Sequence, residues 1–387
     1  MQILFLTSWY PTKKNPTVGI FIKEHAKAIH LAGNELVVIA LLIETSKSLF
    51  TKNVLDYVDE NGIQTIEIRL STRFKDIIYH LIPIQYYICK QTFKSLVSKN
   101  FNPDIIHSNV IFPAGIIGSW LAKSIKKPYI ITEHWSRING LLKKPILSYW
   151  AKKSYKNASK IMPVSVFLQN RISNLIPEIE TNKFAVVGNI VDSNTFNFKE
   201  KSNHENTLQF CAIATWANKK VADKLPELFI EALSKVQINE KRHVKLIMIG
   251  GGDKVEELKL LCKKNNLDAD FTGYLDKIQI SEHLQNSNFF VHASTVETFG
   301  VVTAEALLCG TPVICSNVGA LPELVNDSNG VLCENTESSW IEGIKLAIGT
   351  KYDYPNIAKN IKNDFGLKTI GDKYNAVYSD ICNESKI

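Results

Sequence analysis

The chain has 387 residues, of which 45% are hydrophobic, and a formal net charge of +7. That length is too great for one ordinary domain and favours two domains of roughly 150 to 200 residues. A run of about 18 apolar residues is absent, so a transmembrane helix is not expected. The seven scattered cysteines form no C-x-x-C pair, which argues against a zinc site or a disulfide framework and favours a reducing cytoplasm.

The basic charge lies in the N-terminal half of the chain. Residues 1–200 contain 25 Lys and Arg against 14 Asp and Glu, whereas the remaining residues contain 20 against 24. Such asymmetry predicts an anionic partner for the N-terminal half. A lysine-rich surface without a partner would explain it as well, because lysine outnumbers arginine by 40 to 5.

Short apolar runs alternate with helical patterns in this half. The first run, 2–7, has no basic segment before it and is typical of a β-strand, not of a signal peptide. Helical patterns cover 19–32 and 112–126. Further strands are expected at 35–42, 64–69, 104–107, 128–132, 160–164 and 184–187.

The alternation repeats in the C-terminal half, after a polar segment at 190–205. Near-continuous apolar strands that alternate with helices predict parallel sheets covered on both faces. We therefore expect an α/β protein with two doubly wound domains, and ligands outside the carboxyl ends of their strands, in the cleft between the domains. The expected strands are 208–214, 243–249, 269–272, 288–292, 312–315 and 330–333, and the helices are 223–236, 254–265, 276–286, 299–309 and 336–348.

Two glutamates, Glu297 and Glu305, flank the start of an apolar helix that follows strand 288–292. The first N–H groups of a helix have no partners within it and, with the helix dipole, suit a diphosphate. Gly300 would let a ligand approach the backbone. Glu305 would then accept hydrogen bonds from a ribose, and Glu297 from a group beyond the phosphates. From spacing alone, one capping acid and one solvated acid explain the pair equally well.

The segment "STVETFGVVTAEALLCGTPVICSNVGALPELV", residues 294–325, resembles the signature of family 4 retaining glycosyltransferases (glycosyl transferases group 1). That family has the GT-B fold, with two Rossmann-like domains facing each other across a cleft. Ala320 departs from the pattern, because a second glycine is usual there. The resemblance implies that Glu297 is catalytic and that the nucleotide-sugar donor is held by Glu305, Thr298, Phe299, Gly300 and Val301.

The resemblance extends into the N-terminal half. "NPTVGIFIKEHAKAIHLAGNELVVI" resembles the first glycine loop of the family, which places Gly19 beside the acceptor or a phosphate. His134, after strand 128–132, takes the position of a histidine that lines the sugar pocket, which implies a catalytic role, although a lone histidine after a strand is more often structural. "VGNIVDSNTF", residues 187–196, resembles the hinge of the family.

The start of the C-terminal half departs from the family. Thr215 and Trp216 stand near the usual Gly-Arg pair, so the arginine that holds the donor diphosphate is missing. One lysine among Lys219, Lys220 and Lys224 would supply the charge instead, and the register between them stays open. The loop of "LIMIGGGDKVEELKLL", with Gly251, and the segment near Tyr274 would flank the nucleotide. The glycines do not form a full G-x-G-x-x-G, so a nicotinamide cofactor is not expected.

Two stretches, 73–99 and 137–160, interleave basic residues with aromatic and aliphatic ones. Between Glu133 and Glu178 there are eight Lys and Arg and no acid. Such stretches suit interfacial helices on anionic lipid. Amphipathic helices that cover the sheet of the N-terminal domain explain the apolar residues equally well.

The expected function is retaining transfer of a sugar from a nucleotide-diphosphate sugar, without metal or other cofactor, to a polyprenyl-linked glycan of a bacterial surface polysaccharide. Residues 1–195 would bind the acceptor, 196–370 the donor, and 371–387 would form a helix that returns to the N-terminal domain. We expect a cytoplasmic place, peripheral on the inner face of the membrane, and no nucleic-acid partner. A nucleotide-sugar 2-epimerase is an alternative that the spacing of the two glutamates disfavours. A non-catalytic nucleotide-sugar-binding protein is another, favoured by the missing arginine.

Overall fold

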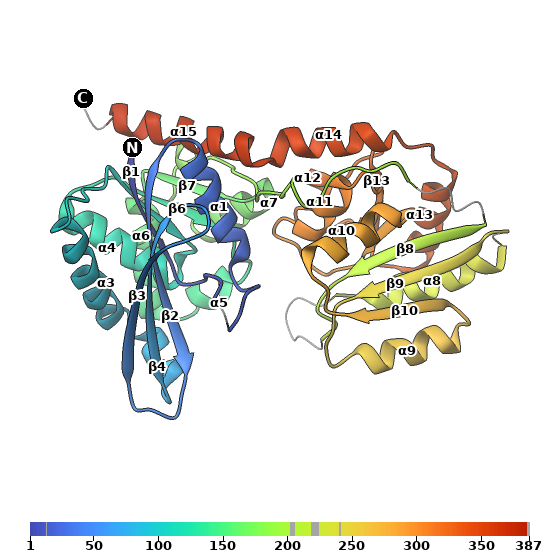
Figure 1. Ribbon diagram of the computed structural model, residues 1–387, viewed down its shortest axis with the longest axis horizontal. Coiled ribbons are helices and arrows are strands. Elements are labelled where there is room, and N and C mark those ends of the chain that lie inside the picture. The colour runs from blue at the N-terminus through green and yellow to red at the C-terminus, as the bar shows by residue number, and fades with distance from the viewer. Residues whose placement is uncertain (13, 202–205, 218–223, 240, 385–387) are drawn as a thin grey trace. The chain divides into compact units, whose positions relative to one another are not determined.

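The computed structural model describes residues 1–12, 14–201, 206–217, 224–239 and 241–384 (Figure 1). The chain forms two compact units. Unit 1 comprises Met1–Ile190 and Leu367–Ile387, and unit 2 comprises Val191–Gly366. The units divide at 190/191 and 366/367, where the sequence led us to expect divisions at 195/196 and 370/371.

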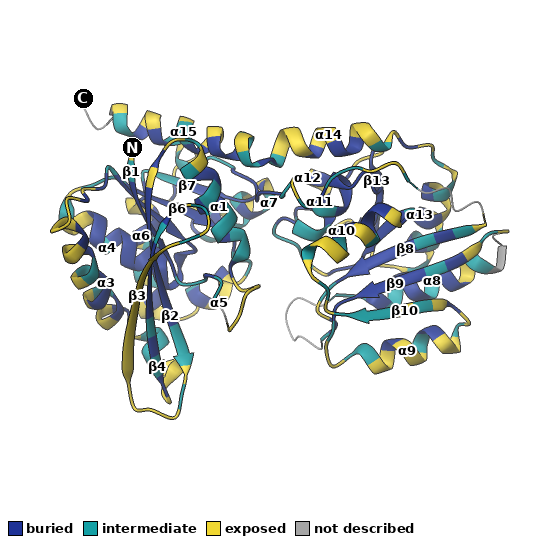
Figure 2. Cartoon of the chain, in the orientation of Figure 1, coloured by how far each residue is buried: buried dark blue, intermediate teal, exposed yellow. Residues whose placement is uncertain are grey.

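Unit 1 is built on a seven-stranded sheet in the order β3-β4-β2-β1-β5-β6-β7. Its strands pair in parallel except β3, which runs antiparallel to β4. The five strands from β4 through β2, β1 and β5 to β6 are largely buried, as their apolar sequences predict (Figure 2). The strands are β1 Gln2–Thr7, β2 Glu35–Thr45, β3 Thr51–Val58, β4 Gln64–Thr72, β5 Ile105–Asn109, β6 Tyr129–Glu133 and β7 Lys160–Pro163.

One strand prediction for unit 1 was wrong, and one strand was missed. The expected strand at 184–187 makes two backbone hydrogen bonds to β7 but forms only an isolated bridge, between Phe184 and Ile161. Strand β3 was not expected, because all eight of its residues are exposed and it lacks the buried apolar run by which the other strands are recognised.

The helices of unit 1 cover both faces of its sheet. The connection from β1 to β2 through α1 moves toward one edge of the sheet, whereas the connections to β5, β6 and β7, through α3, α4 and α6, move toward the other edge. Connections between parallel strands are right-handed, so helices on paths of opposite direction lie on opposite faces. Helix α1 therefore covers one face, where α15 packs against it, and α3, α4 and α6 cover the other. The helices are α1 Ile20–Leu31, α2 Lys75–His80, α3 Ile82–Val97, α4 Ile116–Ile125, α5 Ile138–Leu142, α6 Pro145–Asn157, α7 Val166–Leu175 and α15 Leu367–Glu384.

Unit 2 has a six-stranded parallel sheet in the order β10-β9-β8-β11-β12-β13. The chain moves outward from β8 through β9 to β10, then returns and moves outward on the other side from β11. Strands β8 and β11 thus flank the point where the winding reverses, which is where open α/β sheets bind ligands. The strands are β8 Thr207–Ile213, β9 His243–Ile249, β10 Asp268–Gly273, β11 Phe289–His292, β12 Val313–Ser316 and β13 Gly330–Cys333. The helices are α8 Pro226–Asn239, α9 Val255–Lys264, α10 Lys277–Asn286, α11 Val301–Leu308, α12 Leu321–Leu324, α13 Glu337–Gly349 and α14 Tyr354–Phe365.

Helix α15 is fastened to unit 1 by buried hydrogen bonds. The Tyr374 hydroxyl lies 2.7 Å from Nδ1 of His25, and the Tyr378 hydroxyl lies 2.7 Å from Nδ1 of His107. On its other side, Nε2 of His107 lies 2.8 Å from the Thr132 hydroxyl. Burial holds the pKa of His107 well below its usual range, so the ring is neutral and needs a partner at each nitrogen. The last helix therefore completes the core of unit 1.

Replacing Tyr378 by Phe should loosen α15, because Nδ1 of His107 then stays buried without a partner. We expect a loss of about 1 to 3 kcal/mol in the free energy of unfolding and faster hydrogen exchange in the amides of α15. Tyr87→Phe is the matched control, since that side chain is 62% exposed. Equal exchange rates in both variants would contradict this account.

Candidate active site

The winding reversal of unit 2 brings two distant segments together. The N–H of Leu225 donates to the carbonyl of Ala293, 3.0 Å away, and Lys224 forms an antiparallel bridge with Ser294. This short pairing joins the segment before α8 to the end of β11. Of the three candidate lysines, it places Lys224 beside the expected glutamate. Lys219 and Lys220 lie outside the described residues.

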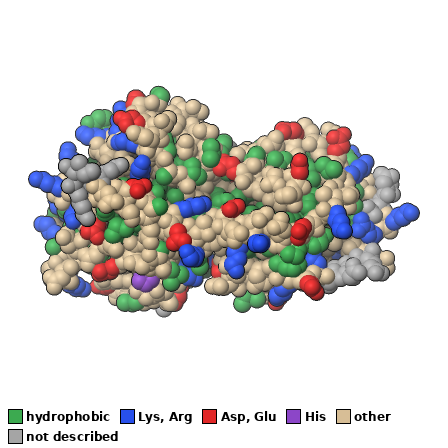
Figure 3. Space-filling model, turned by 90° about the horizontal axis from the view of Figure 1, so that it is seen from above, with side chains coloured by type: hydrophobic (Ala, Val, Ile, Leu, Met, Phe, Trp, Pro, Cys, Tyr) green, Lys and Arg blue, Asp and Glu red, His purple; other side chains and the backbone are tan. Residues whose placement is uncertain are grey.

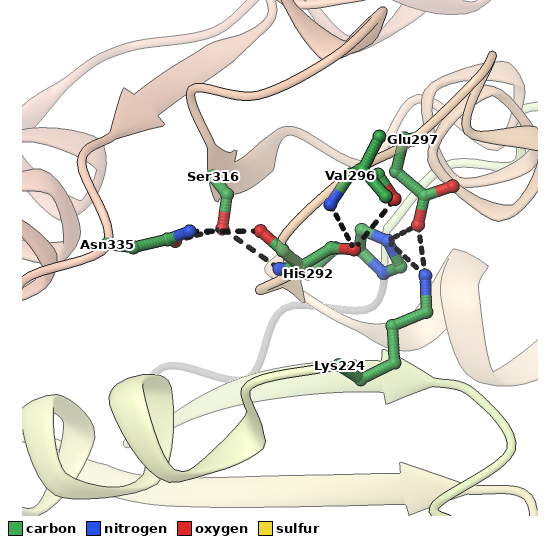
Figure 4. A network of polar contacts seen from close by, with 7 residues as sticks. Lys224, His292, Val296, Glu297, Ser316 and Asn335 are labelled. Atoms are coloured by element: carbon green, nitrogen blue, oxygen red, sulfur yellow. Dashed lines mark hydrogen bonds and ion pairs between the residues drawn. The ribbon is translucent and has the colours of Figure 1, made fainter. Parts of the chain in front are cut away.

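Three side chains meet at this point, as Figure 4 shows. The ammonium of Lys224 makes an ion pair with Oε1 of Glu297. Nε2 of His292 lies 2.8 Å from the same oxygen and 3.2 Å from Nζ of Lys224. His292 ends β11, and the sequence analysis did not single it out, because one histidine at the end of a strand has no distinguishing pattern.

The charges in this cluster support one another. Burial would raise the pKa of the Glu297 carboxyl, but the hydrogen bond to His292 and the charge of Lys224 outweigh it and lower that pKa to about 2. Burial lowers the pKa of His292, and the nearby Lys224 lowers it further. At neutral pH the site therefore holds an ammonium, a carboxylate and a neutral imidazole that donates from Nε2 to Glu297.

Gly319 holds the backbone of Glu297. Its φ is 60°, in the left-handed region, and a Cβ at this position would lie 2.1 Å from the carbonyl oxygen of Glu297. The next residue, Ala320, donates its N–H to that oxygen at 3.0 Å. Ala320 has an ordinary φ of −91°, which explains why alanine is accommodated where the family usually has glycine.

A ring of hydrogen bonds closes the loop after β11. The N–H of Ser294 donates to Oγ of Ser316 at 3.0 Å, and that hydroxyl donates to Oδ1 of Asn335 at 2.6 Å. Asn335 returns a hydrogen bond from Nδ2 to the carbonyl of Ser294 at 3.0 Å (Figure 4). These residues follow or end β11, β12 and β13, so they fix the loop after β11 to the ends of the next two strands of the sheet. The sequence analysis missed all three.

Helix α11 begins directly after the cluster. Gly300 has a φ of 94°, and a Cβ there would lie 2.8 Å from Leu321, so glycine is needed at this turn. The first N–H groups of α11, from Val301 on, cannot be bonded within the helix. Phe299 is buried, with its ring 5.1 Å from that of Phe365, so it can offer a ligand only its backbone. Thr298 and Glu305 are both partly exposed.

Trp216 does not replace the missing arginine. Its side chain is only 2% exposed, and its Nε1–H donates to the carbonyl of Ile249 at 3.1 Å. Its backbone bonds to Gly251 and Lys254. Trp216 therefore fixes the glycine loop after β9.

That loop brings two predicted residues together. A Cβ on Gly251 would lie 2.7 Å from the ring of Tyr274, whose hydroxyl donates to the carbonyl of Gly251 at 3.2 Å. Tyr274 itself is 72% exposed. Its free face and the backbone of the loop are available to a planar base. Among the described residues, no three His, Cys, Asp or Glu side chains gather to ligate a metal ion.

The winding of unit 1 reverses between β1 and β5, where its own predicted residues lie. A Cβ on Gly19, whose φ is 71°, would lie 2.4 Å from the carbonyl of Trp9, so this turn also requires glycine. His134 packs between the rings of Phe21 and His25, and burial holds its pKa well below the usual range. Neither ring nitrogen of His134 reaches a hydrogen-bond partner within the described part of the chain, and the same holds for the side-chain amide of Asn109.

Two family models match the chain. Residues 18–195 match Glycosyltransferase Family 4, and residues 195–364 match Glycosyl transferases group 1. An uncharacterized glycosyltransferase of Methanocaldococcus jannaschii is 28% identical over 71% of this chain and 76% of its own. The putative teichuronic acid biosynthesis glycosyltransferase TuaC of Bacillus subtilis is 23% identical over 97% of this chain and 95% of its own.

A solved structure shares the fold. HepE of Anabaena in complex with UDP superposes with a TM-score of 0.71 at 18% identity, covering 98% of this chain and 100% of HepE. The two family models together extend from residue 18 to residue 364. The chain therefore belongs to the family 4 glycosyltransferases, and its two parallel-sheet units have the GT-B fold.

Proposed function

We propose that this glycosyltransferase transfers a sugar, with retention of configuration, from a nucleotide-diphosphate sugar held by unit 2 to a lipid-linked glycan held by unit 1. The observation that carries the proposal is the cluster of Lys224, His292 and Glu297 at the winding reversal of unit 2, next to the start of α11. It brings a cation from the segment before α8 next to a fixed carboxylate and to the first N–H groups of α11, which have no partner within the helix.

Each part of a nucleotide sugar has a counterpart in unit 2. The amides at the start of α11 and the ammonium of Lys224 suit the diphosphate. Glu305 suits the two ribose hydroxyls, and the exposed ring of Tyr274 suits the base. Because HepE was solved with UDP, uracil is the first base to test.

Lys224 is the principal electrostatic group of the mechanism. As the bond from the anomeric carbon to the phosphate oxygen breaks, negative charge accumulates on the leaving diphosphate. An ammonium fixed next to it stabilises that charge most in the transition state. Lys224 has three protons to donate, so it can keep Glu297 as a partner while it bonds to a phosphate oxygen.

Glu297 acts as a hydrogen-bond acceptor and not as an acid. With a pKa of about 2, its carboxyl stays ionised at physiological pH. It can orient hydroxyls of the donor sugar and hold Lys224 in place. Retention follows when the acceptor oxygen bonds to the face that the phosphate leaves, and the acceptor proton passes to the departing phosphate. We expect this reaction to proceed in EDTA.

The acceptor is proposed to bind at the winding reversal of unit 1. Buried polar atoms of His134 and Asn109 have no partner in the described chain, which suits a ligand that supplies hydroxyl groups. Gly19 lets its own turn pack against the backbone of Trp9 at the same winding reversal. The name of TuaC, a putative teichuronic acid biosynthesis glycosyltransferase, supports a surface-polysaccharide acceptor.

A lipid-linked acceptor is reached from a membrane surface, and unit 1 offers a face for one. Segments 73–97, 116–126 and 143–157, which hold α2, α3, α4 and α6, contain eleven Lys and Arg and one acid, Asp76. By contrast, basic and acidic side chains are mixed on the face that Figure 3 shows, where the molecule is seen from above. The ring of Trp120 lies 5.6 Å from that of Tyr86 and 5.2 Å from that of Trp150, which joins α3, α4 and α6.

Large apolar side chains stand out on these helices. They include Phe74, Ile77, Ile84, Tyr87, Ile146 and Tyr149, all of them exposed. Aromatic and aliphatic side chains among lysines suit the interface of an anionic bilayer. No helix in the described part of the chain combines the length and hydrophobicity needed to cross a bilayer. From their basic charge and their exposed apolar side chains, we propose that α2, α3, α4 and α6 form a peripheral membrane face.

Glu305→Ala should weaken donor binding. Loss of hydrogen bonds to a charged group removes about 1.5 to 3 kcal/mol, or at least about tenfold in Kd. Stabilisation of the folded protein by UDP, GDP, ADP and their sugar conjugates would measure this and identify the base. Glu282→Ala, an exposed acid on α10, is the control. Unchanged affinity in Glu305→Ala would contradict the donor site.

Lys224→Met should lower kcat by on the order of 100-fold while donor affinity changes less, because the lysine acts mainly on the leaving group. The control is Lys235→Met, an exposed lysine paired with Glu337. Single Lys219→Ala and Lys220→Ala variants show whether those lysines contribute. Full turnover in Lys224→Met would refute its role, and donor binding without turnover on any glycan acceptor would favour a nucleotide-sugar-binding protein.

Binding of the protein to vesicles should require anionic lipid and the lysines of the membrane face formed by α2, α3, α4 and α6. Each lysine near such a surface contributes about 1 kcal/mol. Lys152→Glu with Lys153→Glu should therefore weaken binding to phosphatidylglycerol vesicles, measured by sedimentation, by more than about tenfold. The same change at Lys235 and Lys259, exposed on unit 2, should have little effect. Equal binding of the protein to neutral and anionic vesicles would contradict the membrane face.

A further inference from the structure

Strand β3, Thr51–Val58, is the edge strand of the sheet of unit 1. It pairs with β4 on one side and ends the sheet on the other. All eight of its residues are exposed, as Figure 2 shows. Proteins usually shorten, cover or bend an edge of this length, because its outer N–H and C=O groups are ready to pair with another strand.

The side chains of β3 are apolar for an exposed edge. Val54, Leu55 and Tyr57 are each more than a third exposed, and Val58 is 67% exposed. Phe50, just before the strand, is exposed as well. The charged side chains within the strand are one cation, Lys52, and one anion, Asp56.

The strand is self-complementary in one register. If two copies pair antiparallel about a two-fold axis at Val54, Lys52 of each copy faces Asp56 of the other. The same register sets Phe50 opposite Val58 and Thr51 opposite Tyr57. Shifting the axis by one residue to either side sets Lys52 opposite Val54 or Val58, and parallel in-register pairing sets Lys52 opposite Lys52. Opposite charges across a strand pair stabilise it and like charges destabilise it.

The anion of this pair is already ordered. One carboxylate oxygen of Asp56 accepts from Nε2 of Gln64 at 3.1 Å, and the other accepts from Nζ of Lys99 at 3.3 Å. Lys52 of a second copy would thus meet a carboxylate held along the strand, which lowers the side-chain entropy lost on pairing.

We propose that β3 is a self-association surface, on which two copies of this chain pair their β3 strands about Val54 and join their sheets. The contact is one strand wide, below the area of an obligate dimer, so the dimer is transient and depends on concentration. This proposal does not rest on the proposed enzymatic function, because all of its observations come from the sheet of unit 1.

Sedimentation equilibrium of the full chain across the micromolar range tests the pairing. Wild-type protein should show a monomer–dimer equilibrium. Lys52→Asp and Asp56→Lys should each raise the dimer Kd at least tenfold, because each sets like charges opposite one another twice per dimer. The double variant reverses both signs and should recover dimerisation. Circular dichroism and thermal unfolding would verify that each variant is folded.

Crosslinking tests the register. Val54→Cys sets two thiols opposite each other on the axis, and mild oxidation should give a disulfide-linked dimer. Val58→Cys is more exposed but lies off the axis, and with the unchanged chain it serves as the control. A wild-type protein that stays monomeric, variants that all dimerise alike, or equal crosslinking at both positions would overturn the proposal. The proposal would also be overturned if β3 paired only with a strand of another protein.

Discussion

The structure of unit 2 depends on keeping one partly buried carboxylate, that of Glu297, ionised. A charged group in such surroundings must be paired, or its burial strongly destabilises the fold. Glu297 receives a hydrogen bond from His292 and an ion pair from Lys224, and these come from opposite sides of the winding reversal. Gly319, from the turn after β12, supports its backbone. The segment of Lys224, the loop from His292 to Glu297 and the turn at Gly319 are thereby held together at Glu297, and α11 begins four residues further on.

Most of the fold could be predicted because parallel strands are buried on both faces and leave long apolar runs in the sequence. Strand β3 could not be, because an exposed edge strand leaves no such run, and the apolar stretch 184–187 forms only one bridge. At the site, Glu297, Gly300 and Gly319 lie together as the motif indicated. The position of Lys224 beside Glu297 became visible only from the pairing of Leu225 with Ala293, which no spacing in the sequence indicates. His292, Ser316 and Asn335 are single polar residues at strand ends, and no spacing distinguishes them from surface positions.

The buried Trp216 changes how a diphosphate would be held. An arginine binds phosphate through two parallel hydrogen bonds, which fix the orientation of the phosphate. A lysine ammonium is a point charge that attracts the phosphate without fixing its orientation. Here the orientation must come from the backbone. The N–H groups of α11 are aimed by Gly300, and the glycine loop after β9 is fixed by the hydrogen bonds of Trp216. In the proposed donor site, rigid backbone would thus supply the geometry, and Lys224 would supply the charge.

Pairing through β3 would also affect binding to a membrane. Residues opposite one another in an antiparallel pair point to the same face of the sheet. Asp56 points to the face where Lys99 follows α3, so two copies paired through β3 present α3, α4 and α6 on the same side. Both basic faces can then meet one bilayer. The second contact is intramolecular and benefits from a high effective concentration, so two weak contacts bind far more tightly than one. An anionic surface would in turn concentrate the chain and favour the strand pair, which couples dimerisation to membrane binding.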